Sequence, residues 1–198
     1  MFFSLMLNSQ TNYSDSWEDF YSYNNVKDFE KVGERIYALV DNAVFTYNTV
    51  SEELNKLSSV QGLSGETTTS IHYSNSFKRL IIGYENGLVE VVDDDGFITI
   101  SSDIVSFNES GEKSINHIKE FGNSLYLSTP FGIVVYDIEK LEFGDTYFIG
   151  NNSTSLVINQ IEVFNGLIYA ATKNGIYTAD VNSNLLIDFN IKSDIPFM

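Results

Sequence analysis

The amino-acid sequence predicts an all-β fold, a β-propeller of about four four-stranded antiparallel blades that form an incomplete propeller. Three observations support this class. A hairpin-like segment occurs four times, its copies are almost evenly spaced, and each repeat is long enough for four short strands. This is the size of a propeller blade, and a β-sandwich would not explain so constant a period.

The four hairpins set the register of the repeat. They read IYALVDNAVFTY, LIIGYENGLVEVV, LYLSTPFGIVVY and IYAATKNGIYTA, and they start at Ile36, Leu80, Leu125 and Ile168. The starts are 44, 45 and 43 residues apart. Seven positions before each start stands an aromatic or aliphatic residue, and these residues are Phe29, Tyr73, Ile118 and Ile161. So many matching columns indicate a structural repeat.

Each hairpin has turn residues near its middle. The predicted structural turn positions are Asn42, Asn86, Gly87, Gly132, Asn174 and Gly175. A two-residue type I′ turn needs positive φ at both central residues, which Asn and Gly tolerate best. The pairs Asn86-Gly87 and Asn174-Gly175 fit this turn well, whereas Asn42 is followed by alanine and predicts a different geometry in the first repeat.

The repeat divides the chain into blades. In the third repeat the expected strands are INHIKEF, SLYLST, GIVVYDI and DTYFIG. We expect a propeller segment over 11–198, with blades at approximately 24–66, 67–112, 113–156 and 157–192. The stretch SWEDFYSY, at 16–23, is an unpaired strand before the first blade, of the kind that closes a ring on its last blade. Closed rings have about 4–8 blades, so a four-bladed ring is the alternative. Because this strand has no blade to pair with and the sequence ends with the fourth repeat, we expect a truncated open arc.

The first ten residues, MFFSLMLNSQ, form an apolar segment followed by small and polar residues. This order is typical of the end of a signal peptide that lacks its basic leader. An ordinary hydrophobic first strand is the alternative. We therefore expect residues 1–10 to be the remnant of an export signal.

Charge and composition exclude several classes of function. With 27 acidic and 11 basic residues the net charge is −16, which disfavours nucleic acid and anionic membrane surfaces as partners. The chain has no cysteine, so disulfides, thiolate zinc sites and a cysteine nucleophile are excluded. No apolar run reaches the roughly 18–20 residues of a membrane helix, so we expect no direct membrane insertion.

Candidate catalytic groups are few, and we assign no catalytic residue, cofactor-binding residue, cofactor or metal ligand. His72 and His117 occupy one column of adjacent repeats, with Asp28 and Gln160 in the other two. They could approach each other near the central channel as a metal or acid–base pair, but ordinary strand positions are favoured. No nucleophile elbow, zinc-binding His-Glu-x-x-His helix or phosphate-binding glycine loop is present.

An acidic run, Glu85 and three recurring tyrosines are the other candidate positions in the repeat. The run DDDG at 93–96 fails as a calcium loop, because position twelve is Ile104 instead of a bidentate glutamate, and it is expected to be a solvated turn. Glu85 is expected to be an exposed turn residue on a rim that could form a binding surface. Tyr37, Tyr126 and Tyr169 recur with the repeat and are expected to pack between blades.

Several segments together resemble the amino-terminal propeller of the PorZ-like proteins of the type IX secretion system. They are SWEDFYSYNNVKDF, QGLSG at 61–65, LIIGYENGLVEVVDDDG, KSINHI at 113–118, LSTPFGIVVYDIEK and IYAATKNGIYTA. The sequence GYENG followed by FGIVVYD at one blade's distance is fairly specific, whereas GLSG is common in sensor propellers. The resemblance covers about 17–179, nearly the whole chain.

The resemblance implies a non-enzymatic exported protein at the periplasm or outer-membrane surface of a Gram-negative bacterium. Such a protein would be a docking scaffold that helps cargo secretion and attachment, with other secretion-system or cell-surface proteins as partners. PorZ-like proteins also carry a second propeller and a β-sandwich domain, so lipopolysaccharide would be bound only through domains absent here. The alternatives are the periplasmic ligand-sensing propeller of a hybrid two-component regulator and an enzyme with carboxylates in the channel.

Overall fold

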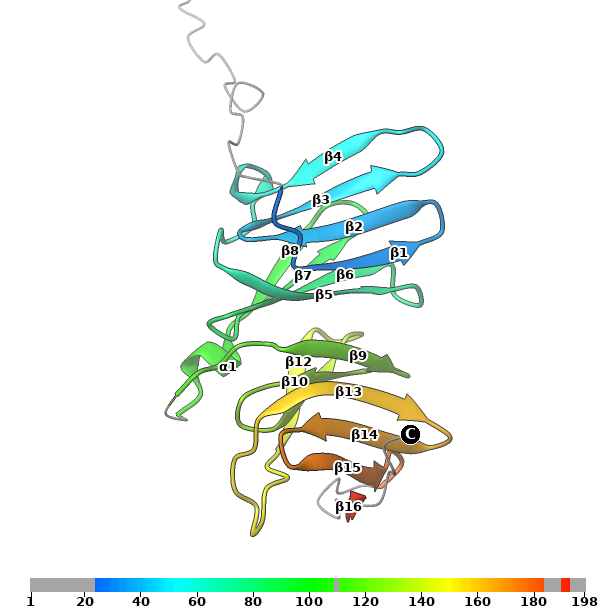
Figure 1. Cartoon of the computed structure of the whole chain (residues 1–198). Coiled ribbons are helices and arrows are strands. Elements are labelled where there is room, and N and C mark those ends of the chain that lie inside the picture. Colours follow the sequence, from blue (N-terminus) through cyan, green and yellow to red (C-terminus); the bar gives the residue numbers. More distant parts are fainter. Residues whose placement is uncertain (1–23, 109–110, 184–189, 193–198) are drawn as a thin grey trace, which may run out of the picture.

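The structure is a computed structural model that describes residues 24–108, 111–183 and, for the backbone, 190–192. Its strands form four antiparallel four-stranded sheets, each a simple meander of consecutive strands (Figure 1). The segments 1–10 and 16–23, predicted to be a signal remnant and an unpaired strand, lie outside the described residues. Four such sheets confirm the predicted class, an incomplete propeller.

The first two sheets follow the first two hairpins. The first comprises β1 (Asp28–Val32), β2 (Arg35–Val40), β3 (Ala43–Asn48) and β4 (Leu54–Leu57). The second comprises β5 (Thr68–Ser74), β6 (Arg79–Tyr84), β7 (Val89–Asp93) and β8 (Ile98–Ser101). A short 3₁₀ helix, η2 (Ser59–Gln61), connects the two sheets.

The other two sheets follow the third and fourth hairpins. The third comprises β9 (His117–Phe121), β10 (Ser124–Ser128), β11 (Ile133–Asp137) and β12 (Glu142–Tyr147). The fourth comprises β13 (Ile158–Phe164), β14 (Leu167–Thr172), β15 (Gly175–Asp180) and β16 (Asn190–Lys192). One turn of helix, α1 (Asp103–Ser106), precedes the third sheet. We refer to the four sheets as blades 1 to 4, and their exact boundaries along the chain stay a prediction.

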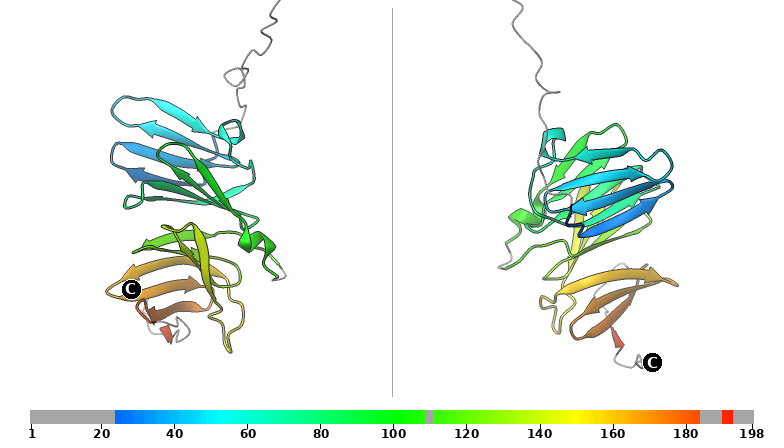
Figure 2. Two further views of the ribbon diagram at one scale, coloured as in Figure 1. Left: turned by 180° about the vertical axis from the view of Figure 1, so that it is seen from behind. Right: turned by 45° about the horizontal axis from the view of Figure 1, so that its top comes forward.

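Alternating strand directions give the arc two rims. The connections β2–β3, β4–β5, β6–β7 and β8–β9 lie at one rim, because every second strand of a meander ends there. We call it the β6–β7 rim. The connections β3–β4 and β7–β8 lie at the opposite rim. The four blades follow one another in chain order in all views (Figures 1 and 2).

Each interface between blades is an apolar layer. The blade 1–2 layer includes Tyr37, Leu39 and Tyr73, and the blade 2–3 layer includes Ile81 and Ile118. The rings of Tyr37 and Tyr73 stack with centroids 5.2 Å apart. Burial of both faces of a strand explains why the hairpins read as nearly continuous apolar runs. The core of this protein is therefore a series of layers between blades.

The predicted tyrosine positions follow this layering. Tyr37 and Tyr126 are buried at 7% and 6% exposure in the layers that blades 1 and 3 form with the following blade. Tyr169 on blade 4 is only half-buried. The tyrosine at this position of the repeat is therefore buried in blades 1 and 3, where the next blade covers it.

No helix of the described residues is long and apolar enough to cross a membrane.

Candidate functional site

The first strand of each blade lines the inner side of the arc. Strands β1, β5, β9 and β13 are neighbours in that order, and all four are labelled in Figure 1. The column predicted to hold Asp28, His72, His117 and Gln160 lies on these strands. Polar side chains thus meet from blades that are more than 40 residues apart in the sequence.

His72 joins three blades. Its Nδ1 lies 3.2 Å from a Glu30 carboxylate oxygen on blade 1, and its Nε2 lies 2.9 Å from a Glu120 carboxylate oxygen on blade 3. Burial lowers the pKa of His72, but the hydrogen bonds to Glu30 and Glu120 outweigh this effect and the pKa is raised. The imidazole therefore acts as a polar bridge between two carboxylates.

His117 has a different environment. Its Nδ1 accepts a hydrogen bond of 3.4 Å from the backbone N–H of Ile161 on blade 4. Burial lowers the pKa of His117, so its neutral form is favoured. The two histidines have their partners on different blades and do not form a hydrogen-bonded pair with each other. Within the described residues no group of three or more His, Cys, Asp and Glu could hold a metal ion.

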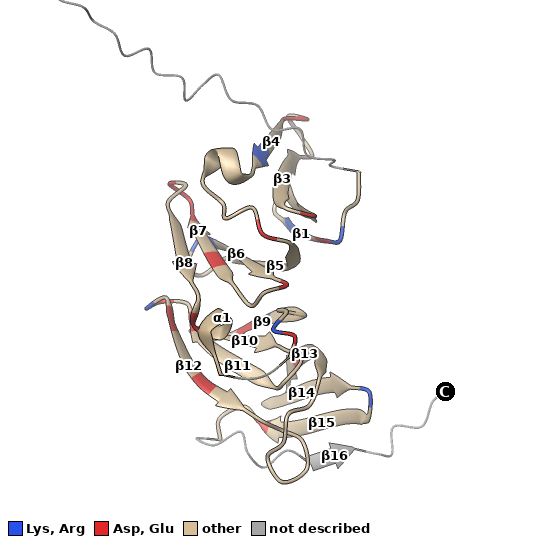
Figure 3. Cartoon of the chain, turned by 90° about the vertical axis from the view of Figure 1, so that its left-hand side faces the viewer, with Lys and Arg blue, Asp and Glu red and all other residues tan. Residues whose placement is uncertain are grey.

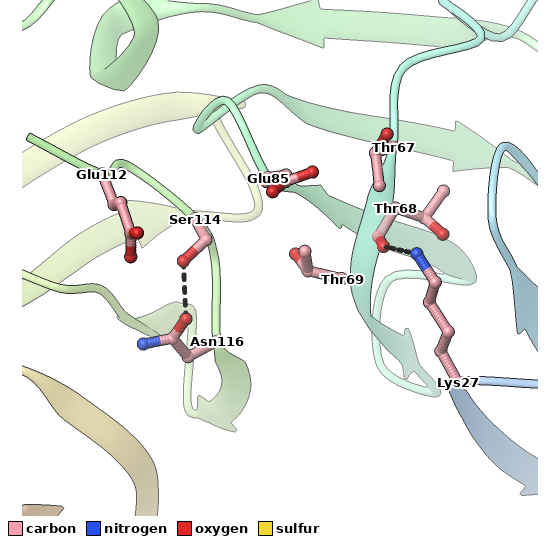
Figure 4. A pocket seen from close by; sticks show the side chains of 8 residues that line it. All are labelled: Lys27, Thr67, Thr68, Thr69, Glu85, Glu112, Ser114 and Asn116. Atoms are coloured by element: carbon pink, nitrogen blue, oxygen red, sulfur yellow. Dashed lines mark hydrogen bonds between the residues drawn. The ribbon is translucent and has the colours of Figure 1, made fainter.

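A polar pocket opens at the β6–β7 rim, where blades 1, 2 and 3 meet. Its volume is about 380 Å³, and it is lined by Lys27, Thr67, Thr68, Thr69, Glu85, Glu112, Ser114 and Asn116. We call it the rim pocket. In Figure 4, Glu85 lies between Glu112 and Lys27, which come from opposite sides of the pocket.

Backbone hydrogen bonds hold the walls of the rim pocket together. The Glu85 N–H donates to the Thr67 carbonyl at 2.9 Å, and the Ile115 N–H donates to the Tyr84 carbonyl at 3.1 Å. The hydroxyl of Thr69 donates to the Ile115 carbonyl at 2.7 Å. Because these bonds connect three segments that are distant in sequence, the pocket is formed only when the blades are packed.

Among the described residues that line the rim pocket, Lys27 is the only cation, and it is already paired. Lys27 Nζ lies 3.1 Å from an Asp41 carboxylate oxygen and donates to the Thr68 carbonyl at 3.1 Å. Glu85 and Glu112 are exposed, and neither has an ion-pair partner among the described residues. The eight lining residues therefore have a net negative charge. The chain as a whole is also acidic, with a net charge of −16, and Figure 3 shows where the acidic and basic residues lie along the described ribbon.

The predicted turn residue Gly87 shapes the rim beside this pocket. Its φ is 88°, and an added Cβ would lie 2.5 Å from a methyl carbon of Ile104. The Gly87 N–H donates to the Tyr84 carbonyl at 3.1 Å, while Asn86 accepts from the Leu88 N–H through its side chain at 3.0 Å. Asn86 does not have positive φ, so the expected type I′ turn is wrong here and Gly87 takes the left-handed conformation by itself.

In blades 1 and 4 the turns lie one residue earlier than predicted. Val40 pairs with Ala43 and Thr172 with Gly175, so Asn42 and Asn174 are the second residues of two-residue loops. Neither asparagine has positive φ. The type I′ turn expected in blade 4 is therefore wrong, whereas the turn of blade 1 differs from type I′ as its alanine predicted. The side chain of Asn42 instead donates to the Gly65 carbonyl at 2.7 Å and ties this turn to the next connection.

Gly132 is required for space. It follows Phe131 in the β10–β11 connection without positive φ, and an added Cβ would lie 2.3 Å from the carbonyl oxygen of Tyr147. A side chain at this position would separate β11 from the neighbouring backbone. The glycine of the third hairpin therefore has a different physical role from that of the second.

The GLSG segment is held by a buried carboxylate. Glu90 on β7 is fully buried, accepts from the Ser64 N–H at 2.9 Å, and is bonded to the Tyr84 hydroxyl. Burial and the bond to Glu90 both raise the pKa of Tyr84. Leu63 inserts into the blade 1–2 layer at 4% exposure. This segment is thus a structural connection that positions the rim.

The acidic turn at 93–96 lies at the opposite rim. The Asp93 carboxylate accepts from the backbone N–H groups of Asp95 at 3.1 Å and Phe97 at 2.8 Å. An aspartate that bonds the backbone two residues ahead is a common turn device. The segment is thus an exposed hairpin turn.

Sequence reasoning identified one residue of the rim pocket, Glu85, as part of a rim surface. It missed Lys27, Glu112, Ser114, Asn116 and the three threonines of 67–69. Their signal is weak, because each lies in a connection or at the start of a strand where polar residues are ordinary.

Four consecutive four-stranded meanders, with their first strands side by side and a polar pocket at one rim, define this chain as a segment of a β-propeller. A sequence model of the family described as type IX secretion system (TSS9), PorZ, N-terminal β-propeller domain matches residues 36–191. The chain belongs to this family. The resemblance of its segments to PorZ-like proteins is therefore confirmed.

Solved structures show the same fold. PorZ, a surface component of the type IX secretion system of Porphyromonas gingivalis, superposes with a TM-score of 0.69 and 20% identity over 81% of this chain. Saccharomyces cerevisiae Sqt1 superposes with a TM-score of 0.69 and 14% identity over 87% of this chain and 50% of its own. The extracellular domain of the putative hybrid two component system BT4673 from B. thetaiotaomicron superposes with a TM-score of 0.65 and 18% identity. The match covers 79% of this chain and 20% of that chain.

The chain spans 21% of the length of the PorZ chain that it matches. A comparison with curated protein sequences gave no match.

Proposed function

We propose that this propeller segment is a non-enzymatic docking scaffold of an exported type IX secretion component, which helps cargo secretion and attachment at the outer membrane. The observation that carries the proposal is membership of the PorZ propeller family over residues 36–191. The fold supports it, because layered blades hold the connections of one rim in a fixed arrangement that suits protein recognition.

The chemistry of the inner strands is consistent with a scaffold. His72 has both ring nitrogens engaged by carboxylates of other blades. A general acid or base needs a free position within hydrogen-bond reach of its substrate. This histidine is therefore assigned a role in joining blades.

The proposal is tested in the bacterium that carries the gene. Removal of the propeller-coding segment from the full-length gene should stop cargo secretion and surface attachment, and an intact copy should restore both. Normal secretion and attachment without the segment, with the rest of the protein still exported at normal levels, would contradict the docking role.

The likeness to extracellular domains of putative hybrid two component systems supports a second candidate, a ligand-sensing propeller. Under this alternative, removal of the segment abolishes a transcriptional response to a glycan and leaves cargo attachment unchanged. Measuring transcripts and surface cargo in the same deletion strain separates the two functions.

A further inference from the structure

We propose that the rim pocket binds the cationic side chain of a lysine or arginine presented by a protein partner. This inference rests on the proposed docking role and adds the chemistry of one contact. The pocket is formed by segments of blades 1, 2 and 3 at the β6–β7 rim, and its volume of about 380 Å³ can admit a long side chain.

The unbalanced carboxylates carry the argument. Lys27 is neutralised by Asp41, which leaves Glu85 and Glu112 without a cation in the part of the chain that the structure describes. Both carboxylates border the same pocket, one from the β6–β7 connection and one from the connection before β9 (Figure 4). A guanidinium or ammonium group between them would form charge-assisted hydrogen bonds, which are about twice as strong as neutral ones.

The remaining polar groups favour a ligand rich in donors. The Ser114 hydroxyl donates to Asn116 Oδ1 at 2.7 Å, and the Thr69 hydroxyl donates to the Ile115 carbonyl, so both hydroxyl oxygens remain available as acceptors. An arginine brings five N–H donors and a lysine brings three, with no acceptor of their own. An anionic ligand would instead be repelled by the two glutamates.

A carbohydrate fits this lining less well. The eight lining residues include no aromatic side chain on which a sugar ring could stack. Hydrogen bonds hold the backbone of Glu85 and the side chain of Thr69 in place before a ligand arrives. A preorganised pocket loses less conformational entropy on binding. The net charge of −16 would also accelerate the approach of a basic partner.

The test uses the full 198-residue chain and two tripeptide probes, acetyl-Gly-Arg-Gly-amide and its citrulline counterpart, which has the same shape without the charge. Peptide is added to ¹⁵N-labelled protein and backbone amide shifts are followed. We expect saturable shifts at Glu85, Gly87 and Ser114 with the arginine peptide, and none with the citrulline peptide.

The double variant E85Q/E112Q removes both charges while keeping side-chain size, and we expect it to weaken binding by about tenfold or more. The matched control E52Q/D95N removes two exposed charges from the opposite rim. It should bind the arginine peptide like the unchanged chain, which separates local recognition from the effect of net charge.

Four results would overturn the proposal: no binding of the arginine peptide, equal binding of the citrulline peptide, equal loss of binding in the two double variants, or shifts confined to other surfaces. None of them depends on the secretion machinery. A negative titration would thus leave the docking role to be decided by the secretion experiment, and a positive titration would stand if that experiment failed.

Discussion

Blade 1 and blade 3 place the same column of the repeat in opposite environments. Phe29 in blade 1 is 65% exposed, whereas Ile118 in blade 3 is 5% exposed, and Tyr73 and Ile161 are buried like Ile118. This column faces the preceding blade, and among the described residues no blade precedes β1. The repeat therefore fixes which side chains point toward a neighbouring blade, and the presence of that blade decides whether they are buried.

The largest expected effect is a direct test of this comparison. Ile118→Ala leaves a cavity in the blade 2–3 layer and should lower the free energy of unfolding by about 2–5 kcal/mol. Phe29→Ala removes a larger side chain but an exposed one, and should cost less than about 1 kcal/mol. Urea unfolding followed by circular dichroism measures both. Equal losses would show that the Phe29 side chain is covered in solution.

A second effect concerns the two rims. Gly87→Ala combines a left-handed φ of 88° with a close contact to Ile104, and should destabilise the fold by about 2–4 kcal/mol. Gly96 at the opposite rim has a similar φ of 82° and nothing within 4 Å, so Gly96→Ala should cost only about 1 kcal/mol. Thermal unfolding measures the loss of stability in both variants. A larger loss for Gly96→Ala than for Gly87→Ala would contradict this account.

A third comparison sets His72 in blade 2 against His117 in blade 3. The pKa of His72 is raised, so its stabilising contribution is complete below about pH 6.5, the ordinary histidine pKa, and is lost as pH rises through the folded-state pKa. The pKa of His117 is lowered by burial, so its protonation in the unfolded state destabilises the fold as pH falls below about 6.5.

Two glutamine variants separate these opposite trends. His72→Gln should lose more stability at about pH 6 than at about pH 8, because only the protonated imidazole is charged and donates to both Glu30 and Glu120. For His117→Gln, the loss relative to the unchanged chain should be smaller at the lower pH. The measurement is the midpoint of urea unfolding at each pH. Identical pH dependence in the two variants would rule out the bridging role of His72.

The smallest expected effect is at the surface of the blade 3–4 interface. Lys119 Nζ lies 2.5 Å from a Glu162 carboxylate oxygen, with side-chain exposures of 31% and 54%. Lys119→Met should cost about 0.2–1 kcal/mol, and the loss should shrink in high salt because exposed pairs are screened. A salt-independent loss would point to packing of the lysine stem as its main contribution.

Much of the fold could be predicted from the sequence, because the repeat constrains several columns at once. The positions of the four hairpins, the layered packing of Tyr37 and Tyr126, and the rim position of Gly87 all follow from it. The turn geometry around Asn86 could not be predicted, since the two-residue loop expected there is replaced by a longer connection with one left-handed glycine. Turn residues indicate a turn without fixing its type.

The sequence by itself determined the four blades and their spacing, because apolar periodicity and turn residues act locally and recur at a constant interval. The family followed from the resemblance of several segments to PorZ-like proteins, which the family model matches over residues 36–191. Only the tertiary structure decided that Glu85 and Glu112 border one pocket, that Lys27 is neutralised by Asp41, and that His72 bridges two carboxylates. The Lys27–Asp41 pair lies within blade 1 and joins the residue before β1 to the β2–β3 connection. The pocket and the His72 bridge join residues from separate blades, and they arise from how the apolar layers stack, which no single repeat encodes.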